Sequence, residues 1–227
     1  MQVIEKKKTI AKQQIIADCG CNVGCPKCSS HRVFIDSMAT ANIPENYWLL
    51  SFKQFQGAPN IKNAVENYIH NLDESYKGGK SLCFAGSPGT GKTMSACTIL
   101  KSAIQKGYTT FYTSFPDMIF NLMDHQVKNT FNRKLMDIDF LCIDEVDARH
   151  FADSENSENF FGRNLEKILR FRIQNRLPII FATNHIKLDD AFGGQFKKII
   201  ESISAQSLQV IPALGPDYRI KNKGRSV

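Results

Sequence analysis

The sequence predicts an α/β fold, in which a parallel β-sheet lies between layers of helices. Short apolar runs such as SLCFAG and LPIIFATN alternate along the chain with longer segments whose apolar residues recur at helical spacing. The apolar runs contain few polar residues, so each strand is expected to be buried on both faces, as in a parallel sheet. The chain has 227 residues, of which 42% are hydrophobic, and can therefore bury a substantial core.

The strands and helices are expected in a regular order after a loop-rich entry. A helix is predicted over 61–79, because its apolar residues follow helical spacing and Gly78 marks a stop. A strand at 81–86 and a helix at 92–107 come next. The remaining predicted elements are a strand at 108–114, a helix at 116–126, a strand at 139–145, a long helix at 159–176 and a strand at 177–184. The polar stretch at 148–159 is expected to form a flexible surface insertion.

The net charge of +7 is concentrated at the two ends of the chain. Residues 1–35 and residues 197–227 each carry six basic and two acidic side chains, whereas the middle is close to neutral. Basic ends suit a polyanion such as nucleic acid, although solvated termini can have the same composition. No apolar run is long enough to span a membrane, and the first residues lack the apolar core of a secretory signal. The expected location is therefore the cytoplasm.

Residues 86–93, which read GSPGTGKT, match the glycine-rich phosphate-binding loop. The glycines let the backbone wrap closely around a phosphate chain, and the helix that follows adds the positive end of its dipole. Lys92 can reach the terminal phosphates, and Thr93 can offer its hydroxyl to magnesium. The predicted nucleotide-binding residues are Gly86, Ser87, Pro88, Gly89, Thr90, Gly91, Lys92, Thr93 and Met94.

Polar residues end two other predicted strands, and they are expected to face the phosphate loop. In a parallel sheet, ligands bind beyond the carboxyl ends of the strands. Asp144 can hold a magnesium ion, while Glu145 can orient and deprotonate a water molecule aimed at the γ-phosphate. Asn184 is predicted to hold that water. The segment TNHIKLDD does not supply the Asn-Lys-x-Asp pattern with which a GTPase binds guanine.

Four of the seven cysteines lie within ten residues near the start of the chain. In a reducing compartment such a group is unlikely to form disulfides, and the Cys25-x-x-Cys28 spacing is typical of a metal knuckle. Cys19 and Cys21 can complete a tetrahedral zinc site, with His31 as an alternate ligand. An iron–sulfur cluster uses similar ligands, and reduced cysteines without a metal are the third possibility.

Three aromatic residues of the entry segment have two interpretations. Trp48, Phe52 and Phe55 can stack on adenine or on single-stranded DNA. Packing of the entry segment onto the core is the favoured interpretation.

The phosphate loop, the Asp144–Glu145 pair and Asn184, in this order, resemble the AAA+ ATPases, and among them the helicase loaders of the DnaC/DnaI type and their IstB-like relatives. The resemblance runs from residue 43 to residue 219 and includes DFLCIDEVD, RLPIIFATNH and GPDYR. It implies a five-stranded parallel sheet between helices and a small or vestigial C-terminal lid. It also implies that Lys92, Asp144, Glu145, Asn184 and Arg219 are catalytic, with Arg219 at the γ-phosphate.

The chain is expected to have three parts. Residues 1–35 are expected to form a zinc-binding segment, residues 36–60 a linker that packs on the core, and residues 61–227 the ATPase domain. DnaI-like loaders carry a zinc module that contacts the helicase, although its cysteine spacing differs from the spacing here. The short segment at 1–35 is therefore predicted to dock the partner.

The helix after the Asn184 strand departs from the family pattern. Loaders carry an arginine finger there, whereas this chain has Lys198 at the first basic position and Ser202 where an arginine is expected. Serine cannot replace a permanently charged, planar guanidinium. Hydrolysis is therefore expected to be slow, or to be assisted by one of the arginines on the preceding helix, which are Arg170, Arg172 and Arg176.

The resemblance leads to a specific prediction of function. The chain is expected to be an ATP-dependent helicase loader that binds ATP and Mg²⁺, single-stranded DNA and a replicative ring helicase. It is expected to oligomerise, alone or on the helicase. The alternatives are a transposition helper ATPase of the IstB type and a zinc-dependent nucleic-acid-binding adaptor with little turnover.

Overall fold

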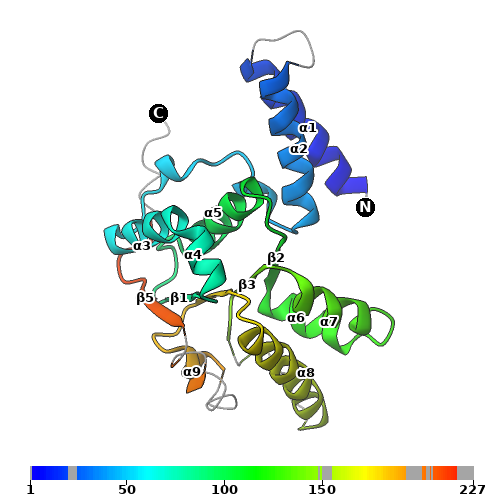
Figure 1. Cartoon of the computed structure of the whole chain (residues 1–227), viewed down its shortest axis with the longest axis vertical. Helices are drawn as coiled ribbons and strands as arrows, with labels where there is room; N and C mark the ends of the chain where they lie inside the picture. The colour runs from blue at the N-terminus through cyan, green and yellow to red at the C-terminus, as the bar shows by residue number, and fades with distance from the viewer. Residues whose placement is uncertain are drawn as a thin grey trace.

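A computed structural model describes residues 2–19, 25–147, 149, 155–192, 201–202, 205 and 207–218; of residues 2, 16–17, 19, 26–28 and 155–161 it describes the backbone alone. The centre of the molecule is a five-stranded sheet with the strand order β2-β3-β4-β1-β5 (Figure 1). All four neighbouring pairs of strands are parallel. The strands are β1 (Ser81–Ala85), β2 (Thr110–Ser114), β3 (Phe140–Asp144), β4 (Ile179–Thr183) and β5 (Leu208–Pro212). The predicted α/β class with a five-stranded parallel sheet is confirmed.

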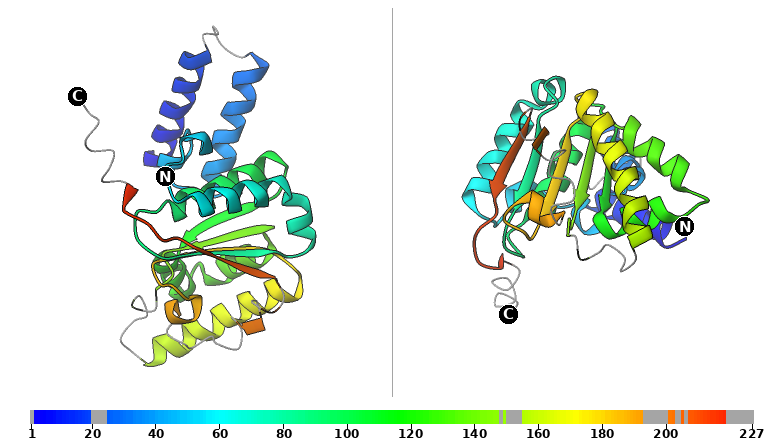
Figure 2. Two further views of the ribbon diagram at one scale, coloured as in Figure 1. Left: turned by 90° about the vertical axis from the view of Figure 1, so that its left-hand side faces the viewer. Right: turned by 90° about the horizontal axis from the view of Figure 1, so that it is seen from below.

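Helices cover both faces of this sheet, as the views in Figure 2 show. The helices before and between the strands are α1 (Gln2–Cys19), α2 (Pro26–Thr40), α3 (Pro59–His70), α4 (Leu72–Lys77), α5 (Lys92–Gln105), α6 (Phe115–Met123), α7 (Lys128–Asp137), α8 (Glu155–Gln174) and α9 (Leu188–Ala191). Two short 3₁₀ turns, η1 (Glu45–Tyr47) and η2 (Phe52–Gln54), lie in the entry segment. Within the described residues, no helix is both long enough and apolar enough to cross a bilayer.

Alternate residues of each strand supply two separate hydrophobic cores. Leu82 and Phe84 of β1 belong to the core that α2, α3 and α5 cover. Cys83 and Ala85 face the opposite way, into the core under α6, α7 and α8. Successive side chains of a strand point to opposite faces, so a strand that is covered on both sides must be apolar throughout. This explains why the strands are continuous apolar runs in the sequence.

Several features of the fold differ from the sequence prediction. The helix predicted at 61–79 divides at Asn71 into α3 and α4. Helix α7 is largely polar in sequence, with Leu135 as its fully buried residue and Phe131 and Met136 partly buried against the same core. Strand β5 lies at the edge of the sheet and has a largely exposed pattern that ends in Pro212. A half-solvated edge strand has fewer apolar positions than the central strands.

Helices α1 and α2 lie side by side as a helical hairpin that projects from the α/β core (Figures 1 and 2). The predicted boundary at residue 35 lies inside α2. Ala11 of α1 and Ile35 and Met38 of α2 are buried in the core that covers one face of the sheet. Three lysines of α1 contact acids, since Lys7 pairs with Glu45, and both Lys8 and Lys12 pair with Asp36. The basic charge at this end is therefore partly neutralised within the fold.

Arg172 on α8 is fully buried and joins three segments at the amino ends of β3 and β4. Its guanidinium donates to the carbonyl oxygens of Leu135 and Ile138 at 2.8 and 2.9 Å, and to those of Asp139 and Pro178 at 2.9 and 2.8 Å. Burial lowers the pKa of Arg172 to about 9, so the side chain stays charged at neutral pH. The Pro178 carbonyl oxygen also accepts from the Leu141 amide of β3 at 3.3 Å, so Arg172 adds a charged donor where β3 and β4 begin to pair.

Replacing this side chain tests its structural role. We expect Arg172→Met to lower the free energy of unfolding by about 3–5 kcal/mol, because buried carbonyl groups lose a charged donor. Arg170→Met is the matched control on the same helix, since Arg170 is exposed and forms only an i,i+4 pair with Glu166. That variant is expected to lose less than about 0.5 kcal/mol. Equal losses in urea-induced unfolding would contradict the assignment.

Candidate functional site

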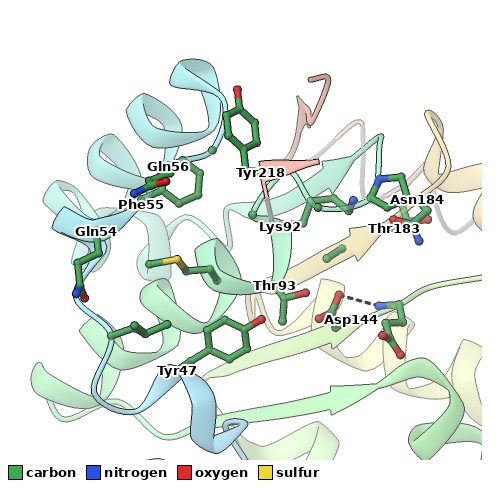
Figure 3. A pocket seen from close by; sticks show the side chains of 18 residues that line it. Tyr47, Gln54, Phe55, Gln56, Lys92, Thr93, Asp144, Thr183, Asn184 and Tyr218 are labelled. Atoms are coloured by element: carbon green, nitrogen blue, oxygen red, sulfur yellow. Dashed lines mark hydrogen bonds between the residues drawn. The ribbon is translucent and has the colours of Figure 1, made fainter. Parts of the chain in front are cut away.

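A cavity of about 560 Å³ opens at the carboxyl ends of β1, β3 and β4 (Figure 3). It lies where the crevice of a parallel sheet is expected to bind ligands. Its volume falls within the range of small-molecule sites. The residues that line it include Tyr47, Phe55, Gly91, Lys92, Thr93, Met94, Asp144, Glu145, Asn184 and Tyr218.

The phosphate loop connects β1 to α5 and forms one wall of the cavity. Lys92, the first residue of α5, is 8% exposed and donates from Nζ to the carbonyl oxygens of Gly86 at 2.9 Å and Ser87 at 2.7 Å. Gly91 caps the helix in a left-handed conformation with φ 94°. A Cβ there would lie 2.5 Å from the Phe55 ring, so only glycine allows the entry segment to pack against this loop.

The last described residues of the chain lie directly against the same loop. The backbone amide of Tyr218 donates to the carbonyl oxygen of Gly89 at 3.1 Å, and Tyr218 lines the cavity. A Cβ on Gly89 would lie 1.9 Å from Oδ1 of Asp217. The GPDYR block singled out in the sequence therefore reaches the phosphate loop. Arg219, the predicted γ-phosphate contact, lies outside the described residues.

Asp144 ends β3 with its carboxylate almost completely buried, at 3% exposure. One carboxylate oxygen accepts from the backbone amide of Glu145 at 2.8 Å (Figure 3). The other accepts from the hydroxyl of Tyr112 on the neighbouring strand β2, also at 2.8 Å. Burial and the nearby Asp144 charge raise the pKa of Tyr112 far above its usual value, so the phenol stays protonated and donates.

Glu145 leaves the strand by a sharp bend and is exposed at the cavity. Its φ of 55° is in the left-handed region that residues other than glycine seldom adopt. The chain then returns to the sheet, because the amide of Val146 donates to the carbonyl oxygen of Ala182 at 3.0 Å. Such strain is found where a side chain must be aimed, and here it carries the Glu145 carboxylate out of the core.

Asn184 follows β4 and lines the cavity with an exposed side chain. The residue before it has a different role, since the Thr183 hydroxyl donates to the carbonyl oxygen of Val146 at 2.7 Å. This bond ties the end of β4 to the bend after Glu145. Asp147, next along the chain, has its pKa lowered by hydrogen bonds from Arg149 and by the charge of His185. The two strand ends are thus joined beside the cavity.

The wall opposite the sheet comes from the entry segment. Lys101 of α5 holds this segment, because its Nζ donates to the carbonyl oxygens of Tyr47 at 2.8 Å and Leu50 at 2.6 Å. Trp48 is buried and donates from Nε1 to the carbonyl oxygen of Ile43 at 2.8 Å, so it packs on the core as predicted. Phe55 reaches the cavity. Tyr47 lines it too, although no sequence motif marks it.

None of the three arginines proposed as substitutes for the missing finger lines this cavity. The suggestion that Arg172 assists catalysis is wrong, because its guanidinium is buried among backbone carbonyls. Arg170 pairs with Glu166 on the surface of α8. Arg176 precedes β4 and lies beside Gly79, at the end of the sheet opposite Asn184. Ser202 is exposed, whereas Lys198 lies outside the described residues.

The predicted zinc ligands belong to the stretch of sequence from the end of α1 to the start of α2. Cys21, together with the side chains of Cys19 and Cys28, lies outside the described residues. Cys25 is partly exposed, and His31 is exposed on α2. Among the side chains that the structure does describe, no three His, Cys, Asp or Glu groups gather to hold a metal ion. The four-cysteine metal site therefore stays a prediction.

The side chains around the cavity fit a nucleotide with a divalent cation. Thr93 and Asp144 line the same cavity and supply hydroxyl and carboxylate oxygens, which are the donors that Mg²⁺ prefers. Lys92 lines the cavity too, and its ammonium contacts the Gly86 and Ser87 carbonyl oxygens of the phosphate loop. Tyr47, Phe55, Met94 and Tyr218 add an apolar and aromatic region large enough for a base.

Solved structures with a similar fold include proteins of DNA replication. DnaI is 20% identical, and the match covers 77% of this chain and 93% of DnaI with a TM-score of 0.60. The DnaC helicase loader is 22% identical, and the match covers 74% of this chain and 99% of the DnaC chain with a TM-score of 0.58. The initiator DnaA, bound to AMPPCP and single-stranded DNA, is 20% identical. This match covers 80% of the present chain and 55% of the DnaA chain, with a TM-score of 0.60. At these identities the likeness shows a shared fold.

A search of curated protein sequences found no significant match. The family model of the ATPases associated with various cellular activities (AAA) matches residues 82–203. This match runs from β1, through the phosphate loop and the Asp144–Glu145 bend, to beyond Asn184, and it spans more than half of the chain. The chain therefore belongs to the AAA family of ATPases.

Proposed function

We propose that this chain binds and hydrolyses ATP and uses that cycle to load a replicative ring helicase onto single-stranded DNA. The observation that carries the proposal is the meeting of Lys92, Thr93, Asp144, Glu145 and Asn184 at one cavity. These residues lie at or after the ends of β1, β3 and β4, which are far apart in the sequence. The AAA family match supports ATP as the nucleotide.

Each side chain has a distinct proposed task. The amides of the phosphate loop and the Lys92 ammonium bind the β- and γ-phosphates. Thr93 and Asp144 would hold Mg²⁺, which supplies positive charge to the phosphate oxygens when it is bound. Glu145, exposed at the end of β3, accepts the proton of the attacking water, and Asn184 orients that water.

The base is proposed to lie between the entry segment and the C-terminal segment. Phe55 packs against Gly91, and Tyr218 is bonded through its amide to Gly89, so the two aromatic residues flank the phosphate loop. Closing a site over the triphosphate excludes water and strengthens the electrostatic contacts inside it. Arg219 follows Tyr218 in the sequence, and we propose that it contacts the γ-phosphate.

Replication is favoured as the process because of the fold. The similar structures include a helicase loader and an initiator bound to an ATP analogue and single-stranded DNA. The projecting hairpin of α1 and α2 offers a surface outside the ATPase core for a partner such as the helicase (Figure 1). Turnover is proposed to be slow, because Arg172 is committed to the fold and Ser202 cannot replace an arginine finger.

Two substitutions test the ATPase assignment. Lys92→Ala is expected to abolish ATP binding, because the phosphates lose their main cationic contact. Glu145→Gln is expected to retain binding while hydrolysis falls by about 10²–10⁴-fold, since only the proton acceptor is lost. Nucleotide binding and single-turnover hydrolysis measure the two effects. Lys106→Ala, at an exposed lysine that pairs with Asp73, is the matched control. Activity that survives Lys92→Ala would overturn the assignment.

The loader function predicts a complex that depends on the nucleotide. With a non-hydrolysable ATP analogue, the chain is expected to bind a fluorescent single-stranded oligonucleotide and the replicative helicase from the same source. Affinity for DNA should fall steeply with salt, because phosphate contacts release counterions. Fluorescence anisotropy and size-exclusion chromatography give the two readouts, with ADP and Lys92→Ala as controls. Capture of a transposase in place of the helicase would favour a transposition helper.

The cysteine cluster gives a separate prediction. We propose that Cys19, Cys21, Cys25 and Cys28 bind one zinc ion, so metal analysis of the purified protein is expected to show about one zinc per chain. Cys28→Ser should lose the metal, whereas Cys97→Ala, at a cysteine buried in the core, should retain it. Iron with visible absorption would indicate an iron–sulfur cluster. Protein without any metal would leave the hairpin tip as reduced cysteines.

A further inference from the structure

We propose that Tyr112 is a positioning residue for the Asp144 carboxylate, and that the foot of the N-terminal hairpin sets the position of Tyr112. The foot is defined as Ala41 and Asn42, the residues that follow α2. The inference rests on the proposed role of Asp144 in holding a divalent cation. It adds that the affinity for this cation depends on a contact outside the ATPase motifs.

The first observation is the hydrogen bond between the two side chains. The Tyr112 hydroxyl donates to Oδ2 of Asp144 at 2.8 Å, and this contact is buried. Tyr112 is 8% exposed and Asp144 is 3% exposed. With the Glu145 amide on Oδ1, both carboxylate oxygens are held. Partners of this kind fix the orientation of a metal-binding carboxylate while leaving lone pairs for the metal.

The second observation is that the foot of the hairpin holds both backbone groups of Tyr112. The Tyr112 amide donates to the carbonyl oxygen of Ala41 at 2.8 Å. The Asn42 side-chain amide donates to the carbonyl oxygen of Tyr112 at 2.9 Å. Strand β2 is an edge strand, so its outer backbone groups have no strand to pair with. Ala41 and Asn42 take the place of that strand at this one residue.

The third observation is that the foot is rigidly connected to α2. Asn42 has φ 57°, and the turn that contains it is closed by the amide of Ile43, which donates to the carbonyl oxygen of Met38 at 3.0 Å. Met38, Ala41 and Ile43 are all buried in the core. A continuous set of contacts therefore runs from the hairpin through Asn42 and Tyr112 to Asp144. A displacement of α2 would be transmitted to Asp144 by this route.

The expected energetic effect follows from the behaviour of outer-shell partners in metal sites. Loss of such a partner typically weakens metal binding by about 10–100-fold, because the ligand is no longer oriented. Binding linkage is reciprocal, so a partner protein that moved the hairpin would change cation affinity, and the bound cation would change affinity for the partner by the same factor.

The test is a Mg²⁺ titration of fluorescent ATP-analogue binding by the full chain. Tyr112→Phe removes only the hydroxyl and is expected to raise the Mg²⁺ concentration at half-saturation by about tenfold. Tyr76→Phe is the matched control, because the Tyr76 hydroxyl also donates to an aspartate, Asp139, at the opposite end of β3. That variant is expected to keep the wild-type Mg²⁺ dependence. Unfolding temperatures, measured in parallel, identify any loss of stability.

Asn42→Gly tests the connection to the hairpin. Glycine keeps the left-handed backbone and removes only the side-chain amide, so the protein remains testable even if Tyr112→Phe fails to fold. A rise of about threefold in the Mg²⁺ concentration at half-saturation is expected, since the effect is indirect. Combined with Tyr112→Phe, this variant should add nothing, because Asn42 acts through the Tyr112 hydroxyl.

Three outcomes separate the possibilities. Wild-type Mg²⁺ dependence in Tyr112→Phe would overturn the inference while leaving the proposed ATPase intact. A fully additive double variant would overturn the connection between Asn42 and Asp144. Wild-type protein whose nucleotide binding does not respond to Mg²⁺ would instead contradict the proposed function itself.

Discussion

The structure depends on one constraint, which is that parallel strands end on the same edge of their sheet. Because β1, β3 and β4 lie side by side and run in one direction, the phosphate loop, Asp144 and Asn184 meet at that edge. The phosphate loop and Asn184 follow β1 and β4, and Asp144 is the last residue of β3. The helices on both faces bury the strands, and the site is left at the end that the helices do not cover.

Hydrogen bonds to the buried Asp144 carboxylate stabilise this edge of the sheet. An ionised carboxylate in a core is costly unless it is hydrogen-bonded. Here the Glu145 amide and the Tyr112 hydroxyl satisfy both oxygens. The same bonds determine the direction of the Glu145 bend and join β3 to the edge strand β2. One polar group thus connects the chemistry of the site to the packing of the sheet.

The phosphate loop also connects parts of the chain that are distant in the sequence. The entry segment and the C-terminal segment are about 160 residues apart, yet Phe55 contacts Gly91 and Tyr218 contacts Gly89. Small residues in the loop allow both approaches. The hairpin, in turn, is attached to the far edge of the sheet through Ala41 and Asn42. The three segments outside the central α/β unit therefore all touch its functional end or the strand that supports it.

Patterns in the sequence were enough to predict the α/β class, the strands β1 to β4 and the positions of the phosphate loop, Asp144, Glu145 and Asn184. These features are local, since each is an apolar run followed by a characteristic polar group. Only the tertiary structure decided the roles of Tyr112, Asn42 and Arg172. Their partners are 32, 70 and up to 37 residues away, and no local pattern records which groups a fold will bring together. From the sequence, a tyrosine or an arginine in an apolar segment can be assigned only to the core or to the surface, because its hydrogen-bond partner is not known.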